Sequence, residues 1–194
     1  MDRPPLPALN SPRLRLRGLR SGDENLLVTL DTDPVVMQFI HDGALSPGDA
    51  RAFAESQIGL AEFRSRWGKW IVELRESSAS IGWVELGKLS GPKRNDLQVG
   101  YEFAPAFWGH GYAVEAVRAV VQYALTKLQL DRVAALVDPE NGRSLRLLRK
   151  LGFELAPEPW EPPDPDAPVP GPVRLCCTRL APESFAPADE SSAV

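Results

Sequence analysis

The sequence predicts a mixed α/β (α+β) domain in which four to five helices flank a central, mostly antiparallel sheet of six to seven strands. The middle of the chain holds three strand-like runs separated by short turn sequences, which is typical of an antiparallel meander. A long amphipathic helical pattern follows at residues 111–128. The 194 residues, 43% hydrophobic and 25% charged, have the composition of one globular domain.

The first third of the chain predicts one strand followed by helices. Arg13–Arg17 alternates charged and apolar side chains, which is the period of a half-exposed strand. Three helix-start signals follow, each with a capping residue or with proline at the first helical position: Ser21-Gly-Asp-Glu24, Asp33-Pro34 and Ser46-Pro47-Gly-Asp49.

The middle of the chain predicts three strands, at residues 67–74, 80–88 and 96–103. Side chains alternate across a strand, so Tyr101 and Glu102 are expected on opposite faces of the third. Pro105 has no N–H to donate to a ladder and must end or distort this strand.

The second half predicts alternating helices and strands. The long amphipathic helix is followed by a strand, and a second helix is ended by a glycine in the C′ position. Two strands that pair with one another complete the domain. The expected bounds are 111–128 for the first helix, 132–137 for the strand, Asn141 to Gly152 for the second helix, and Phe153 and 173–180 for the last strands.

The ends of the chain and one late segment differ in composition from the rest. Residues 1–10 are rich in proline and are expected to form a flexible arm. Residues 157–172 are crowded with proline and acidic residues and are expected to form a loop, while 181–194 read as a disordered acidic tail. We therefore expect a single domain over residues 11–180.

Bulk properties exclude several classes of protein. A net charge of −4 lacks the basic footprint of a nucleic-acid-binding protein, and an acidic surface tolerates a cationic amine substrate. The chain has no run of about eighteen apolar residues, as a membrane span requires. Its first residues, Met1-Asp-Arg-Pro-Pro, lack the apolar core of a secretory signal, so none is expected. We expect a cytoplasmic protein without nucleic-acid or membrane partners. Two adjacent cysteines and two histidines offer no plausible ligand set, so no metal site is predicted.

The stretch from Phe103 to Glu115 joins the third middle strand to the long helix and carries Gly109 and Gly111. Glycine permits backbone conformations that side chains forbid, and it clears space beside the main chain. The first N–H groups of a helix have no intrahelical partner and lie at its weakly positive end. Loop and helix start together predict an anion site suited to a phosphate or pyrophosphate.

Three stretches resemble motifs of the Gcn5-related N-acetyltransferase (GNAT) superfamily: Val99-Gly-Tyr101, Phe107-Trp-Gly-His-Gly-Tyr-Ala-Val-Glu-Ala116, and Asn141-x-x-Ser144 leading to Leu151-Gly-Phe153. The resemblance spans residues 11–180 and points to the ribosomal-protein-alanine N-acetyltransferase (RimJ/RimL-like) branch. One position departs from the pattern, because Ala106 stands where the superfamily's phosphate loop often has Gln or Arg. Phosphate binding by such loops rests mainly on backbone N–H groups, so the site is expected to remain.

The resemblance implies that acetyl-CoA is the cofactor and lies where the fourth and fifth predicted strands splay apart. Its pantetheine arm would pair with the strand edge around Phe103 and Ala104, exposed by a strand bulge at Pro105. Its pyrophosphate would meet the N–H groups of residues 109–114. The expected cofactor-binding residues are Phe103, Ala104, Trp108, Gly109, His110, Gly111, Tyr112, Ala113, Val114, Asn141, Arg143 and Ser144.

The implied reaction is direct attack of a neutral primary amine on the thioester within a ternary complex. A strand N–H near Phe103 or Ala104 is expected to stabilise the oxyanion. Ser144 is the expected acid at the sulfur, with the hydroxyl of Tyr112 as an alternative. Glu102 and Glu85 are the candidate bases, because both lie in strands expected to border the acceptor groove.

The sequence does not identify the acceptor of the acetyl group. It is either a protein N-terminus or a small amine, since fold does not fix function. A non-catalytic module that senses acetyl-CoA is the alternative function on the same scaffold. Pairing through the C-terminal strands would be a route to a homodimer.

Overall fold

The computed structural model describes residues 6–40, 43–61, 63, 66–89, 97–155 and 174–179. Within these residues one eight-stranded sheet has the order β1-β2-β3-β4-β5-β6-β8-β7, and four α-helices and two short 3-10 helices accompany it. The strands are β1 (Leu9–Asn10), β2 (Leu14–Gly18), β3 (Lys69–Leu74), β4 (Ser80–Lys88), β5 (Leu97–Phe103), β6 (Arg132–Val137), β7 (Glu154–Leu155) and β8 (Arg174–Arg179). The helices are α1 (Glu24–Asp31), η1 (Met37–Phe39), α2 (Pro47–Ala61), η2 (Pro105–Phe107), α3 (Tyr112–Thr126) and α4 (Gly142–Lys150).

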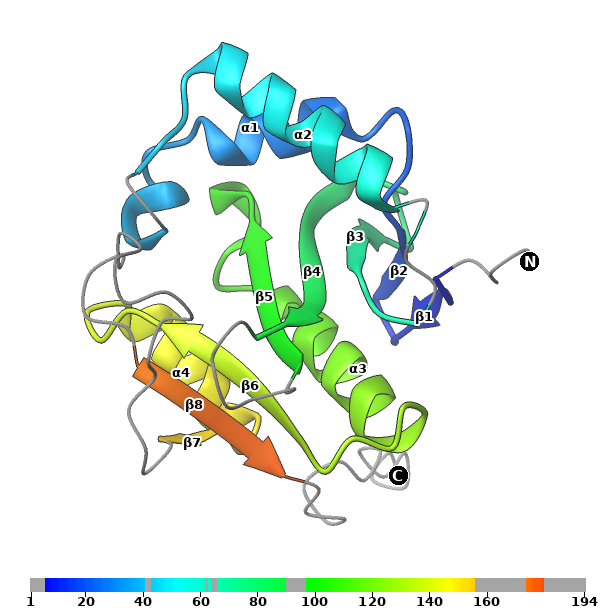
Figure 1. Cartoon of the computed structure of the whole chain (residues 1–194), viewed down its shortest axis with the longest axis vertical. Helices are drawn as coiled ribbons and strands as arrows, with labels where there is room; N and C mark the ends of the chain where they lie inside the picture. The colour runs from blue at the N-terminus through cyan, green and yellow to red at the C-terminus, as the bar shows by residue number, and fades with distance from the viewer. Residues whose placement is uncertain are drawn as a thin grey trace, which may run out of the picture.

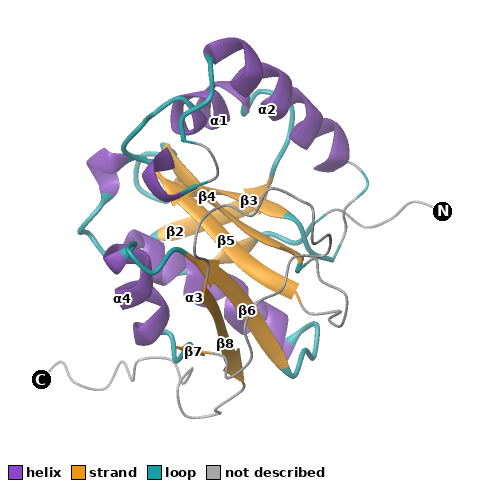
Figure 2. Cartoon of the chain, turned by 60° about the vertical axis from the view of Figure 1, so that its left-hand side comes forward, coloured by secondary structure: helices purple, strands orange, loops and turns teal. Residues whose placement is uncertain are grey.

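The predicted mixed α/β class is confirmed, with helices on both faces of the sheet. α1 and α2 pack side by side on one face, where Leu27, Leu30 and Ala54 meet Ile71 and Trp83 of the strands. α3 and α4 cover the other face over the larger apolar core (Figures 1 and 2). The amphipathic pattern of α3 predicts that one side of the helix is buried. That apolar stripe packs against this core, and its burial stabilises the fold.

The first strand of the sheet lies in the segment expected to be a flexible arm, so that prediction is wrong for its second half. Leu9–Asn10 pair with β2, and Leu6 packs against the core. The indole N–H of Trp70 donates to the carbonyl of Pro7 over 2.8 Å, which holds the segment to β3. Pairing with the neighbouring β2 and a contact 63 positions away together fix the segment, and local composition does not report either contact.

Two of the three helix-start signals behave differently from the prediction. Ser46 caps α2 as expected, since its hydroxyl accepts the N–H of Asp49 at 3.2 Å. Ser21 does not cap α1. Asp23 is the N-cap there, and its carboxylate binds the Arg17 guanidinium through two 2.7 Å contacts instead of a helix N–H. Asp33 accepts the N–H of Val35 and stabilises a turn, so only the short η1 follows where a full helix was predicted.

The sheet opens between β5 and β6, as the resemblance implied. These parallel strands pair only at Gln98 and Ala134, near their beginnings, and Figure 1 shows them diverging toward their ends. The predicted bulge at Pro105 is not present, because β4 and β5 pair in continuous register up to Gly82 and Phe103, and Pro105 begins η2. A Cβ on Gly82 would lie 2.8 Å from the Cα of Phe103, so glycine is what allows the strands to meet closely there.

The C-terminal elements follow the predicted order. Gly152 ends α4 with a φ of +75°, and β7 pairs antiparallel with β8. β8 also pairs with β6 and so lies inside the sheet. The predicted loop 157–172 and tail 181–194 lie outside the described residues. No described helix has both the length and the apolar character needed to cross a membrane.

Candidate active site

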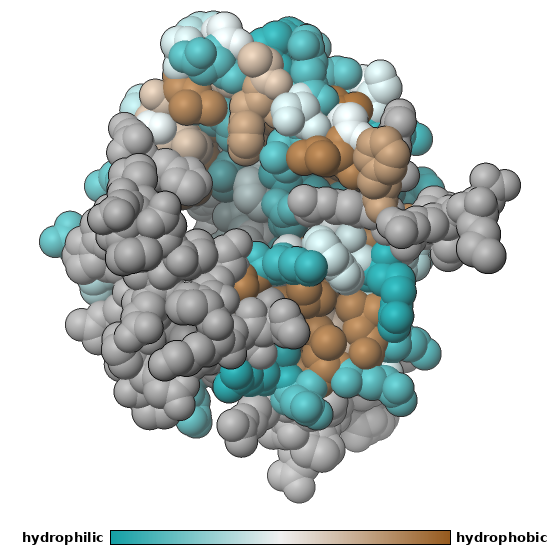
Figure 3. Space-filling view, in the orientation of Figure 1, coloured by the Kyte–Doolittle hydropathy of each residue, from teal (hydrophilic) through white to brown (hydrophobic). Residues whose placement is uncertain are grey.

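A cleft of about 1030 Å³ lies between the α1–α2 layer and the sheet. β3, β4 and β5 form its floor, α1, η1 and α2 its wall, and the end of β6 with the start of α4 its far side. The cleft therefore reaches the gap between β5 and β6. Figure 3 shows hydrophobic surface in separate patches along the upper edge of the molecule, where α2 lies. Phe53 of α2 lines the cleft and is 47% exposed.

The predicted phosphate loop lies between β5 and α3. Gly109 and Gly111 have φ values of +81° and +79°, and Gly111 is the N-cap of α3 without any side-chain cap. The first intrahelical bond of α3 runs from the N–H of Glu115 to the carbonyl of Gly111, so the N–H groups of residues 112–114 have no helical partner. These groups and the glycine backbone could hold a pyrophosphate at the positive end of the helix.

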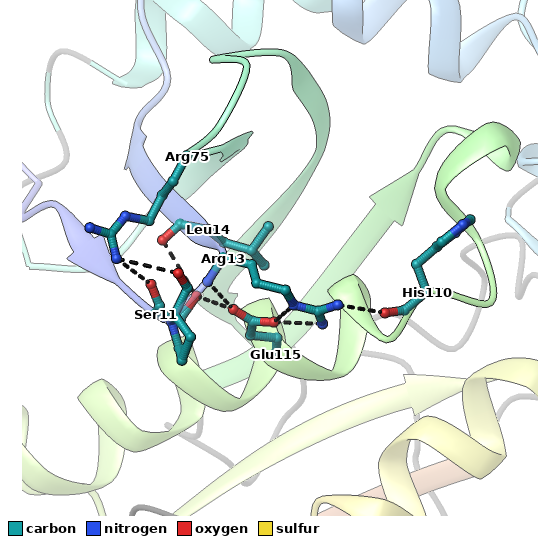
Figure 4. Close-up of polar contacts among 7 residues, drawn as sticks. Ser11, Arg13, Leu14, Arg75, His110 and Glu115 are labelled. Carbon is teal, nitrogen blue, oxygen red and sulfur yellow. Dashed lines mark hydrogen bonds and ion pairs between the residues drawn. The ribbon is translucent and has the colours of Figure 1, made fainter. Parts of the chain in front are cut away.

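The N-terminal strand segment is fastened to this loop by a set of contacts that we call the loop tie: Ser11, Arg13, Glu115 and the His110 carbonyl (Figure 4). Arg13 forms an ion pair with Glu115 at 2.7 Å and donates to the His110 carbonyl at 3.0 Å. Its backbone N–H and the hydroxyl of Ser11 both donate to the other Glu115 oxygen. These hydrogen bonds hold the pKa of Glu115 below its usual range despite partial burial.

The edge of β5 presents backbone groups to the gap. The N–H of Ala104 donates to the carbonyl of Ile81 on β4 at 3.0 Å, so it is not available as the predicted oxyanion donor. Because successive residues of an antiparallel strand point their N–H groups to opposite sides, the N–H groups of Tyr101 and Phe103 face β6. The Phe103 carbonyl accepts the indole N–H of Trp108 at 2.7 Å. Of the two predicted oxyanion donors, the N–H of Phe103 is the one that faces the gap.

The start of α4 lies across the gap from β5. Asn141 is the N-cap of α4, and its side-chain oxygen accepts the N–H of Ser144 at 3.0 Å. The hydroxyls of Ser144 and Tyr101 lie 2.7 Å apart, which joins α4 to β5 beside the cleft. The guanidinium of Arg143 lies 4.5 Å from the ring centroid of Trp108, so α4 also contacts the phosphate loop.

A buried carboxylate lies on the floor of the cleft. Glu102 is 7% exposed, and no described residue donates a hydrogen bond to its Oε2 atom. Burial, with the nearby negative charge of Asp31, raises the pKa of Glu102 to about 7. The positive charge of Lys69 and the neighbouring Trp83 indole oppose this rise without cancelling it. Glu102 therefore exchanges a proton near neutral pH, as a general base must.

Glu85 and Lys69 lie beside Glu102 in the same cleft. Lys69 is 7% exposed, its ammonium lies 3.7 Å from a Glu85 oxygen, and it also lies 3.7 Å from the ring centroid of Trp83. Asp31, the last residue of α1, is 5% exposed, and burial raises the pKa of its carboxyl. Asp31, Glu85, Glu102 and Lys69 thus lie in one cleft, which Asp49, Asp138 and Lys88 also line.

The geometry separates two proton-handling groups. Tyr101 and Glu102 are consecutive on β5, so their side chains lie on opposite faces of the strand, as predicted. Tyr101 meets Ser144 on the α4 side, while Glu102 lies in the carboxylate cluster. A group bound in the β5–β6 gap would have an acid on one side and a base on the other.

The structure brings most of the predicted residues together around the gap and loop. His110 is exposed and its ring stacks on that of Tyr112, and the Arg13 guanidinium lies 4.5 Å from the Tyr112 ring centroid. Tyr112 is not among the residues that line the cleft, and Tyr101 takes its place as the second hydroxyl. No group of three metal-ligating side chains is found in the part of the chain that the structure describes.

Sequence reasoning missed Asp31, Lys69, Tyr101 and Arg13 as site residues. Tyr101 stood in a recognised motif, and its place beside Glu102 would have suggested a paired role. Asp31 had one usable signal, since a carboxylate at the C-terminal end of a helix is opposed by the helix dipole. The role of Arg13 depends on a partner 102 positions away, which the sequence alone does not indicate.

Known proteins share this architecture. The family model described as acetyltransferase (GNAT) domain matches residues 13–154. YoaA of Bacillus subtilis (strain 168), an uncharacterised N-acetyltransferase, is 30% identical over 149 residues, which cover 76% of this chain and 83% of the relative.

Solved structures show the same fold at lower identity. A GNAT-family acetyltransferase from Bacillus anthracis superimposes with a TM-score of 0.72 at 21% identity, over 89% of this chain and 98% of that one. A spermidine N-acetyltransferase from Vibrio cholerae, in complex with CoA and spermine, gives a TM-score of 0.67 at 19% identity, over 87% and 96%. The family match covers most of the described chain, and the site geometry agrees with it. This chain belongs to the GNAT family of acetyl-CoA-dependent N-acetyltransferases.

Proposed function

We propose that the enzyme acetylates a small primary amine, with Glu102 as the general base and the Tyr101–Ser144 pair as the proton donor to the CoA sulfur. The observation that carries this proposal is the placement of these groups on opposite faces of β5, beside the gap to β6. In this arrangement the acetyl thioester lies in the gap, the amine approaches from the α1–α2 side, and the thiolate leaves toward α4.

The base must remove a proton from the amine around the attack on the carbonyl. A free alkylammonium has a pKa of about 10.4, so it is almost fully protonated near pH 7. Glu102 is a carboxylate above its pKa of about 7, it lines the cleft, and its Oε2 receives no hydrogen bond from the described residues. Glu85 is the alternative base, but the Lys69 ammonium lies 3.7 Å from its carboxylate and already engages it.

The acid must protonate the departing thiolate. A phenol, with an ordinary pKa of about 10, is a better proton donor than a serine alcohol. The 2.7 Å contact lets Tyr101 and Ser144 act as one donor. Ser144 would give its proton to sulfur as it takes the phenolic proton of Tyr101, and the phenolate left on Tyr101 would then regain a proton from solvent. The N–H of Phe103, which faces the same gap, would stabilise the oxyanion.

Each part of acetyl-CoA is proposed to bind one of the groups described above. Its pyrophosphate binds the N–H groups of residues 109–114, its pantetheine arm lies along Tyr101 and Phe103, and Asn141 shapes the far side. Arg143 and Trp108 lie where these two regions meet. The neighbour bound to CoA and spermine supports a small amine as acceptor, because the same fold holds both ligands there.

Replacing Tyr101 by Phe or Ser144 by Ala should lower kcat by about tenfold each and leave the Kd of CoA nearly unchanged. If the two hydroxyls form one donor, the double variant should lose little more than either single variant. Stopped-flow thiol release under saturating acetyl-CoA measures kcat. A double variant whose loss equals the product of the single losses would show that the hydroxyls act separately.

The first test of the activity is a thiol-release screen with acetyl-CoA against small amines and N-terminal peptides, run beside thermal shifts with CoA and acetyl-CoA. Release with an amine and stabilisation by both CoA species support the proposal. Stabilisation without release from any acceptor would instead favour an acetyl-CoA sensor. Absence of stabilisation by either CoA species would refute the placement of the cofactor site.

A further inference from the structure

Asp31 is buried in the cleft, and none of the residues that the structure describes forms an ion pair with its carboxylate. It is 5% exposed, lines the cleft, and accepts no hydrogen bond at its carboxylate from any residue in the described ranges. It also ends α1, where the helix dipole disfavours a negative charge. A buried carboxylate in such surroundings is costly, so a cationic ligand would stabilise it strongly.

The neighbouring lysine does not neutralise this region. Lys69 forms its ion pair with Glu85 and lies over the ring of Trp83, and no ion pair within 4.0 Å joins it to Asp31 or Glu102. Lys69 is therefore paired with Glu85, and its ammonium forms no ion pair with the two more deeply buried carboxylates, Asp31 and Glu102. Glu102 adds the second observation, because its Oε2 is buried, lines the cleft and has no described partner.

We propose that Asp31 forms an ammonium subsite and that the acceptor is a diamine or polyamine. One amino group reacts beside Glu102 while a second, still protonated, binds the Asp31 carboxylate. Apolar side chains of the same cleft, Met37, Phe39 and Phe53, would contact the methylene chain between the two groups. A protein N-terminus carries only one amine at the required position, so this subsite favours a small acceptor. The inference rests on the proposed function.

The test compares putrescine, a diamine, with 4-aminobutanol, in which a hydroxyl replaces the second amine. For the natural protein kcat/KM for putrescine should exceed that for 4-aminobutanol by about tenfold or more, the size expected for a charge-assisted contact. Asp31→Asn should reduce this ratio to near one. Asp49→Asn is the matched control, because Asp49 lines the same cleft but its carboxylate already accepts the Ser46 hydroxyl at 2.6 Å, so the ratio should persist.

Each outcome separates the inference from the function on which it rests. Equal rates with both amines, or a ratio that Asp31→Asn does not change, would overturn the subsite while acetylation itself stands. Preferred acetylation of a peptide N-terminus without a lysine would also overturn it. No acetylation of any amine would overturn the proposed function. The Kd of CoA, measured for each variant, shows that the protein is folded.

A different observation carries a second inference, which concerns the loop tie. The Arg13 guanidinium donates to the His110 carbonyl at 3.0 Å (Figure 4), and its other terminal nitrogen lies 3.5 Å from the position that a Cβ on Gly111 would take. In a trans peptide the carbonyl and the next N–H point in opposite directions, so this contact turns the N–H of Gly111 away from Arg13. The Arg13 ion pair also offsets the negative charge of Glu115 in the first turn of α3, where an incoming pyrophosphate would meet it.

We infer that Arg13 is a positioning residue for the pyrophosphate of the cofactor. Arg13→Ala should lower kcat/KM for acetyl-CoA by about tenfold or more through KM, with kcat at saturation little changed. S-acetylpantetheine lacks the pyrophosphate, so its kcat/KM should change much less. A merely structural loss would lower both donors equally.

Arg75→Ala is the matched control for the loop tie. Arg75 donates to the carbonyls of Ser11 and Pro12 on the same segment, as Figure 4 shows for Ser11, and no described contact joins it to the phosphate loop. Arg75→Ala should leave unchanged the ratio of kcat/KM for acetyl-CoA to kcat/KM for S-acetylpantetheine. Glu115→Gln keeps the size of the side chain and should give an intermediate loss for acetyl-CoA. Equal loss for both donors in Arg13→Ala, or the same selective loss in Arg75→Ala, would overturn the inference.

Discussion

Replacing Glu102 by Gln is expected to lower kcat by about 10²- to 10⁴-fold, the usual contribution of a positioned general base. Glutamine has nearly the shape of glutamate but cannot take a proton from the amine. The Kd of CoA should change little, because the carboxylate lines the part of the cleft where the acceptor amine is proposed to bind. Glu85→Gln is the control on the neighbouring strand and should cost much less, since its charge is shared with Lys69.

The pH dependence of kcat/KM gives the sharper form of this prediction. Burial raises the pKa of Glu102 to about 7, so the carboxyl is protonated and inactive below that pH and ionised above it. Activity should therefore rise with pH through about 7, and the rise should be absent in Glu102→Gln. A rise that persists in Glu102→Gln but disappears in Glu85→Gln would move the base to Glu85.

The same raised pKa affects stability. The folded protein holds a proton on Glu102 up to about pH 7, whereas the unfolded chain releases it near the ordinary value of 4.5. Between these two values the folded state binds more protons, so this group's contribution to the free energy of unfolding falls as pH rises, by at most about 3 kcal/mol. In Glu102→Gln this decrease in the free energy of unfolding should be absent. The melting temperature of the variant, relative to that of the natural protein, should therefore rise between pH 5 and 7.

Gly111→Val is expected to raise the Kd of CoA by about two orders of magnitude or more. Gly111 has a φ of +79°, which a β-branched residue adopts only at a cost of about 1–3 kcal/mol. A side chain there would also begin 3.5 Å from the Arg13 guanidinium. Relief of the φ strain moves the loop N–H groups away from the positions that an anion requires, and the valine methyl groups would also stand beside the Arg13 guanidinium. Calorimetric titration with CoA measures the effect.

Gly22→Val is the matched control for Gly111→Val. Gly22 has a φ of +100° in the turn before α1, a Cβ added to it would meet nothing within 4 Å, and it does not line the cleft. The substitution should destabilise the fold by a similar amount and leave CoA binding intact. Unchanged CoA affinity in Gly111→Val, or an equal loss in Gly22→Val, would show that the pyrophosphate does not bind at this loop.

Much of the sheet could be predicted because local periodicity specifies it. The bounds 80–88 and 132–137 agree with β4 and β6, since alternation and flanking turn residues mark these strands directly. The start of α3 at the glycine pair followed from backbone chemistry. The full helix predicted from Asp33-Pro34 was wrong, because an aspartate that caps a turn has the same sequence signature as one that caps a helix.

The parts of the site that could not be predicted depend on contacts between distant segments. Asp31 is buried because the loop after η1 returns to it, where the N–H of Leu45 donates to its carbonyl. Ser11 and Arg13 reach Glu115 across more than a hundred positions. Glu102 was predicted as a candidate base from its strand, but its raised pKa follows from burial that only the packed cleft shows.

The single residue pair between β5 and β6 divides the hydrogen-bond ladder into two ribbons, β1–β5 and β6–β8. Backbone bonds join these ribbons weakly, although both contribute to the core beneath α3. A cofactor whose arm lies in the gap would bridge them and make them open together. Amide hydrogen exchange would then report two separate opening units in the free enzyme and one in the complex, so acetyl-CoA would act as the missing strand of the fold.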